Sequence, residues 1–102
     1  YFEGDPAAAA LGDTFVRKPL YSREGQNIEL QRNGNSEIPH PGDYGSEGHI
    51  LQAYHPLPLF DGNYPMAGCW LIASQPAGMC IREDTTFVTG DDARFIPHVI
   101  LD

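Results

Sequence analysis

The sequence predicts an α+β chain dominated by β-structure, in which an antiparallel sheet is accompanied by one short helix. Two observations carry this prediction. One stretch near the N-terminus has the composition of a helix. Most of the remainder consists of short runs of branched and aromatic residues bounded by Gly, Pro, Asn and Asp, which is the pattern of strands separated by turns.

The helix is expected at Ala7–Leu11 (AAAAL). Asp5 precedes it as a side chain that can cap the first free backbone N–H groups, and Pro6 suits the first helical position. Gly12 supplies the residue at which such a helix ends.

The strands follow in order along the chain. Residues 34–48 and 56–65 are rich in Gly, Pro, Asn and Asp and are expected to be ordered excursions between strands. Five runs predict strands, and two shorter ones are expected after them: Thr14–Leu20, Asn27–Gln31, His49–His55, Ala67–Ser74 and Met79–Glu83, then Thr86–Thr89 and Phe95–Ile100.

The expected strand arrangement bears on whether the two cysteines, Cys69 and Cys80, can form a disulfide. A turn at residues 75–78 would place Cys69 opposite Asp84 and Cys80 opposite Ala73, four positions out of step. At about 3.3 Å per residue, that offset exceeds the roughly 7 Å that a disulfide can span between Cα atoms. Free thiols in a reducing, cytoplasmic compartment are therefore expected.

Length and charge exclude several classes of function. A chain of 102 residues is one domain or a fragment of one, and its lack of an initiator Met favours a fragment of something longer. The formal net charge of −8 disfavours binding to nucleic acid or anionic lipid. No apolar run approaches the roughly 20 residues of a membrane helix.

Lys18, the chain's only lysine, is the first candidate functional residue. It precedes Pro19 at the end of a predicted strand, and the loop Ser22–Gly25 follows with a hydroxyl, a guanidinium and a glycine that permits close approach. These are the parts of a phosphate-binding site. The alternative is a solvated edge strand followed by an ordinary turn.

Arg82 is the second candidate, in the stretch GMCIRED. Its guanidinium can stabilise charge on a phosphoryl group in transfer, and the alternative is a surface ion pair with Glu83 or Asp84. A zinc site is disfavoured because the four histidines and two cysteines form no CxxC or HxxxH pattern. Neither cysteine has the surroundings of a nucleophile.

Four motifs together resemble a known family. VRKPLYSREGQNI, GDYGSEGHILQAYHPLPLFDGNYP, GCWLIASQPAGMCIRED and ARFIPHVI follow one another between Thr14 and Ile100. In order and spacing they resemble the C-terminal part of the ATP-grasp domain of the glutathionylspermidine synthase family, in particular its bacterial members without an amidase domain. The resemblance implies the fold of a C-terminal ATP-grasp lobe.

The resemblance also implies roles for individual residues. Lys18 would contact nucleotide phosphate, the following loop would close over the phosphates, a second segment would hold the adenine, and a third would pack near the nucleotide. Arg82 would stabilise the transition state. The implied nucleotide-binding residues other than Lys18 are Ser22, Glu24, Gly25, Gln52, Ala53, Tyr54, His55, Phe87, Val88 and Thr89.

The reaction implied is ATP-dependent C–N ligation, in which a glutathione-like carboxylate is phosphorylated and a spermidine-like amine attacks the acyl phosphate. The acidic and Asn ligands of Mg²⁺ are expected outside this chain, which would then be inactive alone. Two alternatives stay open, a non-catalytic nucleotide- or peptide-binding module and a plain interaction domain. A lobe cut from its partner is expected to expose apolar surface, through which copies of the fragment can associate.

Overall fold

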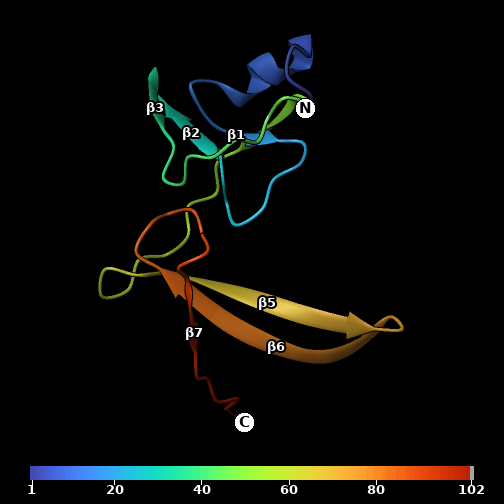
Figure 1. The fold of residues 1–102 in the computed structure, drawn as a ribbon, viewed down its shortest axis with the longest axis vertical. Helices are drawn as coiled ribbons and strands as arrows, with labels where there is room; N and C mark the ends of the chain where they lie inside the picture. Colours follow the sequence, from blue (N-terminus) through green and yellow to red (C-terminus); the bar gives the residue numbers. More distant parts are fainter. Residues whose placement is uncertain (102) are drawn as a thin grey trace. The chain divides into compact units, whose positions relative to one another are not determined.

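A computed structural model describes residues 1–101 of the chain. The chain divides into two compact units, Tyr1–Pro56 and the residues from Leu57 onward, each with its own antiparallel sheet (Figure 1). The prediction of a β-dominated chain with antiparallel pairing and one short helix is confirmed. It expected one sheet where the structure has two.

The helix η1 is a 3-10 helix over Pro6–Leu11. Asp5 accepts a hydrogen bond from the backbone N–H of Ala7 at 2.9 Å, so the predicted cap is formed. The helix ends at Gly12, whose φ of 71° and N–H bond to the carbonyl of Ala9 close the last turn.

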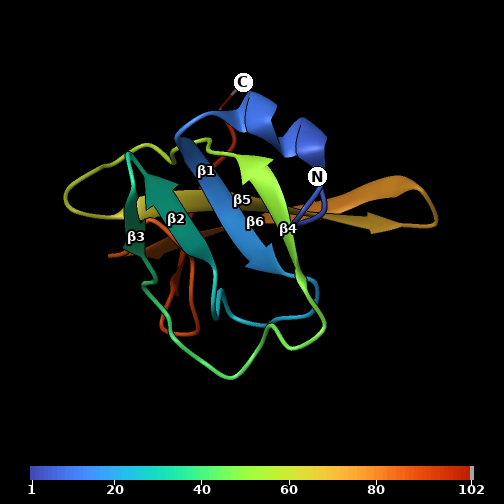
Figure 2. The same ribbon diagram turned by 90° about the horizontal axis from the view of Figure 1, so that it is seen from above.

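The first unit contains a four-stranded sheet in the order β3-β2-β1-β4 (Figure 2). All three pairings are antiparallel. Strand β3 was not predicted from the sequence; the two-residue turn Asn33-Gly34, with φ of 51° and 82°, joins it to β2. The strands are β1 (Thr14–Pro19), β2 (Glu29–Arg32), β3 (Asn35–Glu37) and β4 (His49–Ala53).

The N-terminal residues lie along the outer edge of β4. The amino group of Tyr1 donates to the carbonyl of Leu51 at 2.9 Å, and the N–H of Leu51 donates back to the carbonyl of Tyr1 at 2.7 Å. The backbone N–H of Glu3 donates to the carbonyl of His49 at 3.0 Å. The edge of β4 is therefore covered along these residues, and Glu3 is brought next to the sheet.

The second unit contains a three-stranded sheet in the order β5-β6-β7, made of β5 (Tyr64–Ile72), β6 (Gln75–Asp84) and β7 (Arg94–Ile96). The turn between β5 and β6 is Ala73-Ser74, with φ of 50° and 64°, and not residues 75–78 as predicted. The correct register pairs Cys69 with Met79 and Gly68 with Cys80.

The new register gives another reason for free cysteines. Residues in neighbouring register positions point to opposite faces of a sheet, so Cys69 and Cys80 face away from each other. Both thiols are free in the structure, as expected, but the predicted four-residue offset was wrong.

Little of the chain is fully buried. Leu30 is the buried hydrophobic residue among residues 1–101, at 1% exposure, and the buried charged residues are Glu29 and Asp84. Large apolar side chains are exposed at the end of the β5–β6 hairpin, where Trp70, Leu71 and Ile72 are 63–69% exposed. Apolar surface of this kind is a contact surface or an aggregation risk. No helix described in the structure is long and apolar enough to cross a membrane.

Candidate functional site

A cavity of about 220 Å³ lies where β1 gives way to the loop leading to β2. The four residues predicted to bind phosphate in this part of the chain, Lys18, Ser22, Glu24 and Gly25, all line it. Arg23 also lines it, and its remaining wall is apolar, made by Pro19, Leu20 and Ile28. The structure therefore brings the predicted lysine and the predicted loop to one cavity.

The loop beside the cavity is shaped by its own hydrogen bonds. The N–H of Gln26 bonds to the carbonyl of Arg23 at 2.9 Å, and the hydroxyl of Ser22 donates to the carbonyl of Gln26 at 2.7 Å. Glu24 and Gly25 both have left-handed φ values, 56° and 71°. This conformation costs Glu24 of the order of 1 kcal/mol, which the surrounding bonds offset.

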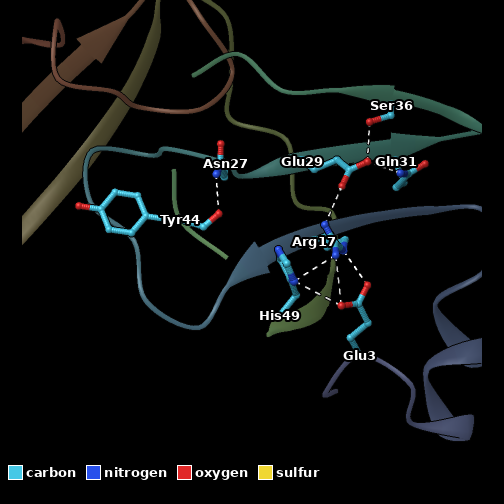
Figure 3. Close-up of polar contacts among 8 residues, drawn as sticks. All are labelled: Glu3, Arg17, Asn27, Glu29, Gln31, Ser36, Tyr44 and His49. Atoms are coloured by element: carbon cyan, nitrogen blue, oxygen red, sulfur yellow. Dashed lines mark hydrogen bonds and ion pairs between the residues drawn. The ribbon is translucent and has the colours of Figure 1, made fainter. Parts of the chain in front are cut away.

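Asn27 ties the loop to the glycine-rich excursion between β3 and β4. Its side-chain N–H donates to the carbonyl of Gly42 at 2.7 Å and also to that of Tyr44 (Figure 3), and its Oδ1 accepts from the N–H of Gly42 at 2.6 Å. Its backbone N–H bonds to the carbonyl of His40 at 2.8 Å. The excursion is therefore ordered against the cavity loop. Sequence reasoning gave Asn27 no such role.

The cavity has a positive lining in an acidic chain. The charged residues that line it are two cations, Lys18 and Arg23, and one carboxylate, Glu24, whereas the chain as a whole has a net charge of −8. Lys18 is half-buried, and no carboxylate within residues 1–101 pairs with it. Among the described residues, none accepts a hydrogen bond from the backbone N–H of Glu24 or Gly25. An anion is the ligand that suits these donors.

The residues predicted to hold the adenine begin on β4, the strand that pairs with β1 beside Lys18. Lys18 pairs with Ile50, and Val16 with Gln52, so Lys18 and Gln52 project from the same face. Ala53, opposite Phe15, projects from the other face.

Tyr54 and His55 lie just after β4, which ends at Ala53. The guanidinium of Arg32 lies 5.6 Å from the ring centre of Tyr54, a cation–π contact. Arg32 pairs with Thr14 and therefore belongs to the Lys18 face. His55 is exposed.

The opposite face of the sheet holds a charged network around Arg17 (Figure 3). Its guanidinium bonds to both oxygens of Glu3, at 2.7 and 3.2 Å, and to Glu29 at 3.4 Å. It also lies 3.0 Å from Nδ1 of His49. The hydrogen bond from Arg17 is the main reason that the pKa of Glu3 is lowered, and the bond to Glu3 likewise raises the pKa of Arg17.

Arg82 projects from one face of the second sheet together with Met66 and Phe95, its partners in register. Its guanidinium carbon lies 5.4 Å from the ring centre of Phe95, and one NH2 donates to the carbonyl of Gly90 at 3.2 Å. Its Nε is buried without a hydrogen-bond partner among the described residues. An unsatisfied buried donor is uncommon in native structures, and strain, a catalytic role, or a bound water or ion can explain one.

The alternative expected for Arg82, an ion pair with Glu83 or Asp84, is replaced among the described residues by other contacts. Glu83 projects from the opposite face and pairs with Arg94 at 3.3 Å. Asp84 accepts hydrogen bonds from backbone N–H groups of the segment that follows it. Arg82 is therefore held by a carbonyl and an aromatic ring.

The predicted strand Thr86–Thr89 is wrong, since these residues form a bend. The N–H groups of Thr85 and Thr86 bond to the Asp84 carboxylate, so they are not free for a strand partner. The hydroxyl of Thr86 donates to the carbonyl of Val88 at 2.6 Å, and that of Thr89 lies 3.8 Å from the sulfur of Met66. The bend, which contains Phe87, Val88 and Thr89, returns to the face that carries Arg82.

The described residues contain no group of three or more His, Cys, Asp or Glu side chains arranged to hold a metal ion. The donors at the Lys18 cavity suit an anion, because two of the three charged side chains lining it are cationic. The lining of this cavity therefore suits an anion better than it suits Mg²⁺.

Comparison with known proteins decides the family. The family described as glutathionylspermidine synthase preATP-grasp matches residues 1–101. This chain belongs to the glutathionylspermidine synthase family. The resemblance drawn from the four sequence motifs is therefore confirmed at the level of the family. Because the description refers to a preATP-grasp region, the assignment to a C-terminal ATP-grasp lobe stays a prediction.

Two curated relatives carry names of synthesising enzymes. A Haemophilus influenzae protein named "Putative acid--amine ligase" is 42% identical over 90 residues, which cover 82% of this chain and 23% of the relative. The trypanothione synthetase of Crithidia fasciculata is 32% identical over 83 residues, covering 79% of this chain and 13% of the relative. The chain therefore spans less than a quarter of the length of either relative.

Proposed function

We propose that this chain is the nucleotide-binding part of an ATP-dependent acid–amine ligase. In the proposed reaction, the γ-phosphate of ATP is transferred to a carboxylate, an amine attacks the resulting acyl phosphate, and an amide, ADP and phosphate are formed. A glutathione-like carboxylate and a spermidine-like amine are the proposed substrates. The observation that carries the proposal is the cavity lined by Lys18 and the Ser22–Gly25 loop. Membership of the glutathionylspermidine synthase family supports the ligase class.

The cavity has the chemistry that a triphosphate needs. Lys18 places an ammonium group beside the loop, without a competing carboxylate in the described part of the chain. The backbone N–H groups of Glu24 and Gly25 add donors whose positions are set by the loop. Donors held in place before the ligand arrives lose little entropy on binding, so positioning and charge neutralisation can be supplied together.

The remaining nucleotide contacts are proposed for two further groups. Gln52 and Tyr54 share the Lys18 face and would meet the base, with Ala53 and His55 offering backbone groups beside them. Phe87, Val88 and Thr89 would pack near the nucleotide from the bend after β6. Arg82, on the same face as that bend, would stabilise the charge that develops as the phosphoryl group moves.

Residues 1–101 contain no group of three or more His, Cys, Asp or Glu side chains that could hold the divalent metal of the proposed reaction. When bound, Mg²⁺ neutralises charge on the phosphates. We propose that its ligands come from other parts of the family polypeptide, and that the 102 residues alone are inactive. The fold is proposed to be the C-terminal lobe of an ATP-grasp domain.

The test is an NMR titration of the full-length protein with ATP and Mg²⁺, comparing wild type with Lys18→Ala. We expect saturable shifts at the amides of residues 22–25 and 52–55, and at least about a tenfold weaker affinity in the variant, since a charge-assisted hydrogen bond contributes about 1.5–3 kcal/mol. Arg94→Gln is the matched control, because it removes a cation that is exposed and paired with Glu83.

Two results would contradict the proposal. The first is the absence of saturable shifts around the cavity up to millimolar ATP in the full-length protein. The second is an equal loss of affinity in Lys18→Ala and Arg94→Gln, which would show that only overall charge matters.

A further inference from the structure

Asp84 is a buried carboxylate at the end of β6, with 6% of its surface exposed. One oxygen accepts from the N–H groups of Thr85 at 2.7 Å and Thr86 at 3.4 Å, and the other accepts from Gly90 at 2.9 Å. Burying a carboxylate is costly unless it is hydrogen-bonded, and these bonds satisfy both oxygens. They also draw the two ends of the bend, residues 85–90, to one side chain.

Gly90 links this carboxylate to Arg82. Its N–H bonds to Asp84, and its carbonyl accepts the bond from the NH2 of Arg82 at 3.2 Å. Asp84 and Arg82 are two residues apart on one strand and therefore project from the same face. Gly90 is itself buried, so the position of its carbonyl depends on these neighbours more than on solvent.

We propose that Asp84 is a positioning residue for Arg82. By holding Gly90, its carboxylate puts a carbonyl oxygen where it fixes the guanidinium above Phe95. The same bonds shape the bend containing residues 87–89, so one side chain orients both the guanidinium and the segment proposed to pack near the nucleotide. The proposal rests on the proposed function, because it assigns Arg82 to the transferring phosphoryl group.

The chemistry favours a carboxylate over an amide at this position. The two oxygens of Asp84 accept at least three N–H groups. Asn in the same place has one acceptor oxygen, so its NH2 would face a backbone N–H at one end of the bend. Asp84→Asn therefore keeps the size of the side chain. Its one oxygen can serve the two N–H groups of Thr85 and Thr86, so the link at Gly90 is the one that is broken.

The first measurement is the side-chain Nε–H signal of Arg82 and the amide exchange of Gly90 in the full-length protein. In Asp84→Asn we expect the Arg82 signal to shift and the Gly90 amide to exchange at least about tenfold faster, since a buried hydrogen bond is lost. Glu83→Gln is the matched control, a neighbouring carboxylate on the opposite face that pairs with Arg94. It should leave both signals unchanged.

The second measurement is turnover, as ADP released from ATP and Mg²⁺ with glutathione and spermidine as probes. We expect Asp84→Asn to lower kcat by about 10- to 100-fold, the effect of a small displacement of a catalytic group, while KM for ATP changes less than about threefold. In an Arg82→Lys background the same substitution should have a much smaller effect, because the two residues act as a unit.

The outcomes separate this proposal from the one on which it rests. An unchanged Arg82 signal in Asp84→Asn, or an equal change in Glu83→Gln, overturns the positioning role. So does a loss of kcat in Asp84→Asn that is undiminished in the Arg82→Lys background, because it would reflect general damage to the fold. A wild-type Arg82 signal that does not respond to ATP would instead contradict the proposed function, even where the Asp84 variant shifts that signal.

Discussion

The two faces of the four-stranded sheet carry adjacent cations in opposite situations. Arg17 projects from one face and makes ion pairs with two carboxylates, Glu3 and Glu29. Lys18, the next residue, projects from the other face toward a cavity, and no carboxylate of residues 1–101 pairs with it. The alternation of a β-strand therefore separates a structural cation from one available to a ligand.

The network around Arg17 shows what a cation in a structural role looks like. Glu29 is 9% exposed, and its carboxylate also accepts bonds from Ser36 and Gln31, so every charged group there has partners within the unit (Figure 3). Lys18 is half-buried as well, but its neighbours in the cavity are a loop and apolar side chains. Burial alone does not distinguish the two residues, whereas pairing does.

Arg17→Met should give the largest change. Removing the guanidinium leaves the buried Glu29 carboxylate with neutral donors alone, and we expect a loss of about 2–3 kcal/mol in the stability of the sheet. Hydrogen exchange of the β1 amides measures that loss in the intact protein. ATP affinity should stay within about twofold of wild type, because Arg17 lies on the other face. A large loss of affinity without faster exchange would reverse the assignment of the two faces.

Lys18→Met should show the reciprocal pattern with a smaller free-energy change. ATP affinity should fall by at least about tenfold, equivalent to about 1.4 kcal/mol. Exchange of the β1 amides should change by less than about 0.5 kcal/mol, the usual limit for a substitution away from the core. Isothermal titration with ATP and Mg²⁺ gives the affinity. A destabilisation as large as that of Arg17→Met would mean that Lys18 has a structural role instead.

Local signals in the sequence were sufficient for part of the fold. The Asp5-Pro6 start and Gly12 end of the helix were predicted because each acts on its immediate neighbours. The strand at residues 35–37 was missed although Asn33-Gly34 is a strong hairpin signal. The β5–β6 turn was misplaced because Gln75-Pro76-Ala77-Gly78 has turn-like composition, while the residues that adopt left-handed φ are Ala73 and Ser74.

The candidate site was harder to predict from the sequence than the fold, because its geometry depends on side chains that are distant in the sequence. The lysine and its loop were identified from a motif that is contiguous in sequence, and both line one cavity. The bend after β6 was predicted as a strand, since branched residues at 86–89 carry no sign that the Asp84 carboxylate takes their N–H groups. The Arg17 network joins Glu3, Glu29 and His49, which are brought together by the strand register and by the backbone bonds of the N-terminal residues to β4.

Glu3→Gln should give the smallest change, and one that depends on pH. The folded pKa of Glu3 is lowered from its ordinary value of 4.5, mainly by the hydrogen bond from Arg17. A carboxylate with a lowered pKa stabilises the fold above its ordinary pKa, and that contribution is lost as the pH falls through the folded pKa. Because Glu3 is 45% exposed, solvent screening limits the effect to less than about 1 kcal/mol.

Exchange of the β4 amides that pair with the N-terminal residues measures this contribution. The difference between wild type and Glu3→Gln should be largest near neutral pH and should shrink as the pH is lowered below 4.5. Glu37→Gln is the control, an exposed carboxylate on β3 for which little change is expected at any pH. A difference that grows on acidification would contradict the assignment of this contribution to the hydrogen bond between Arg17 and Glu3. The N-terminal residues would then be held to the sheet by other contacts, and Arg17 would act mainly on Glu29.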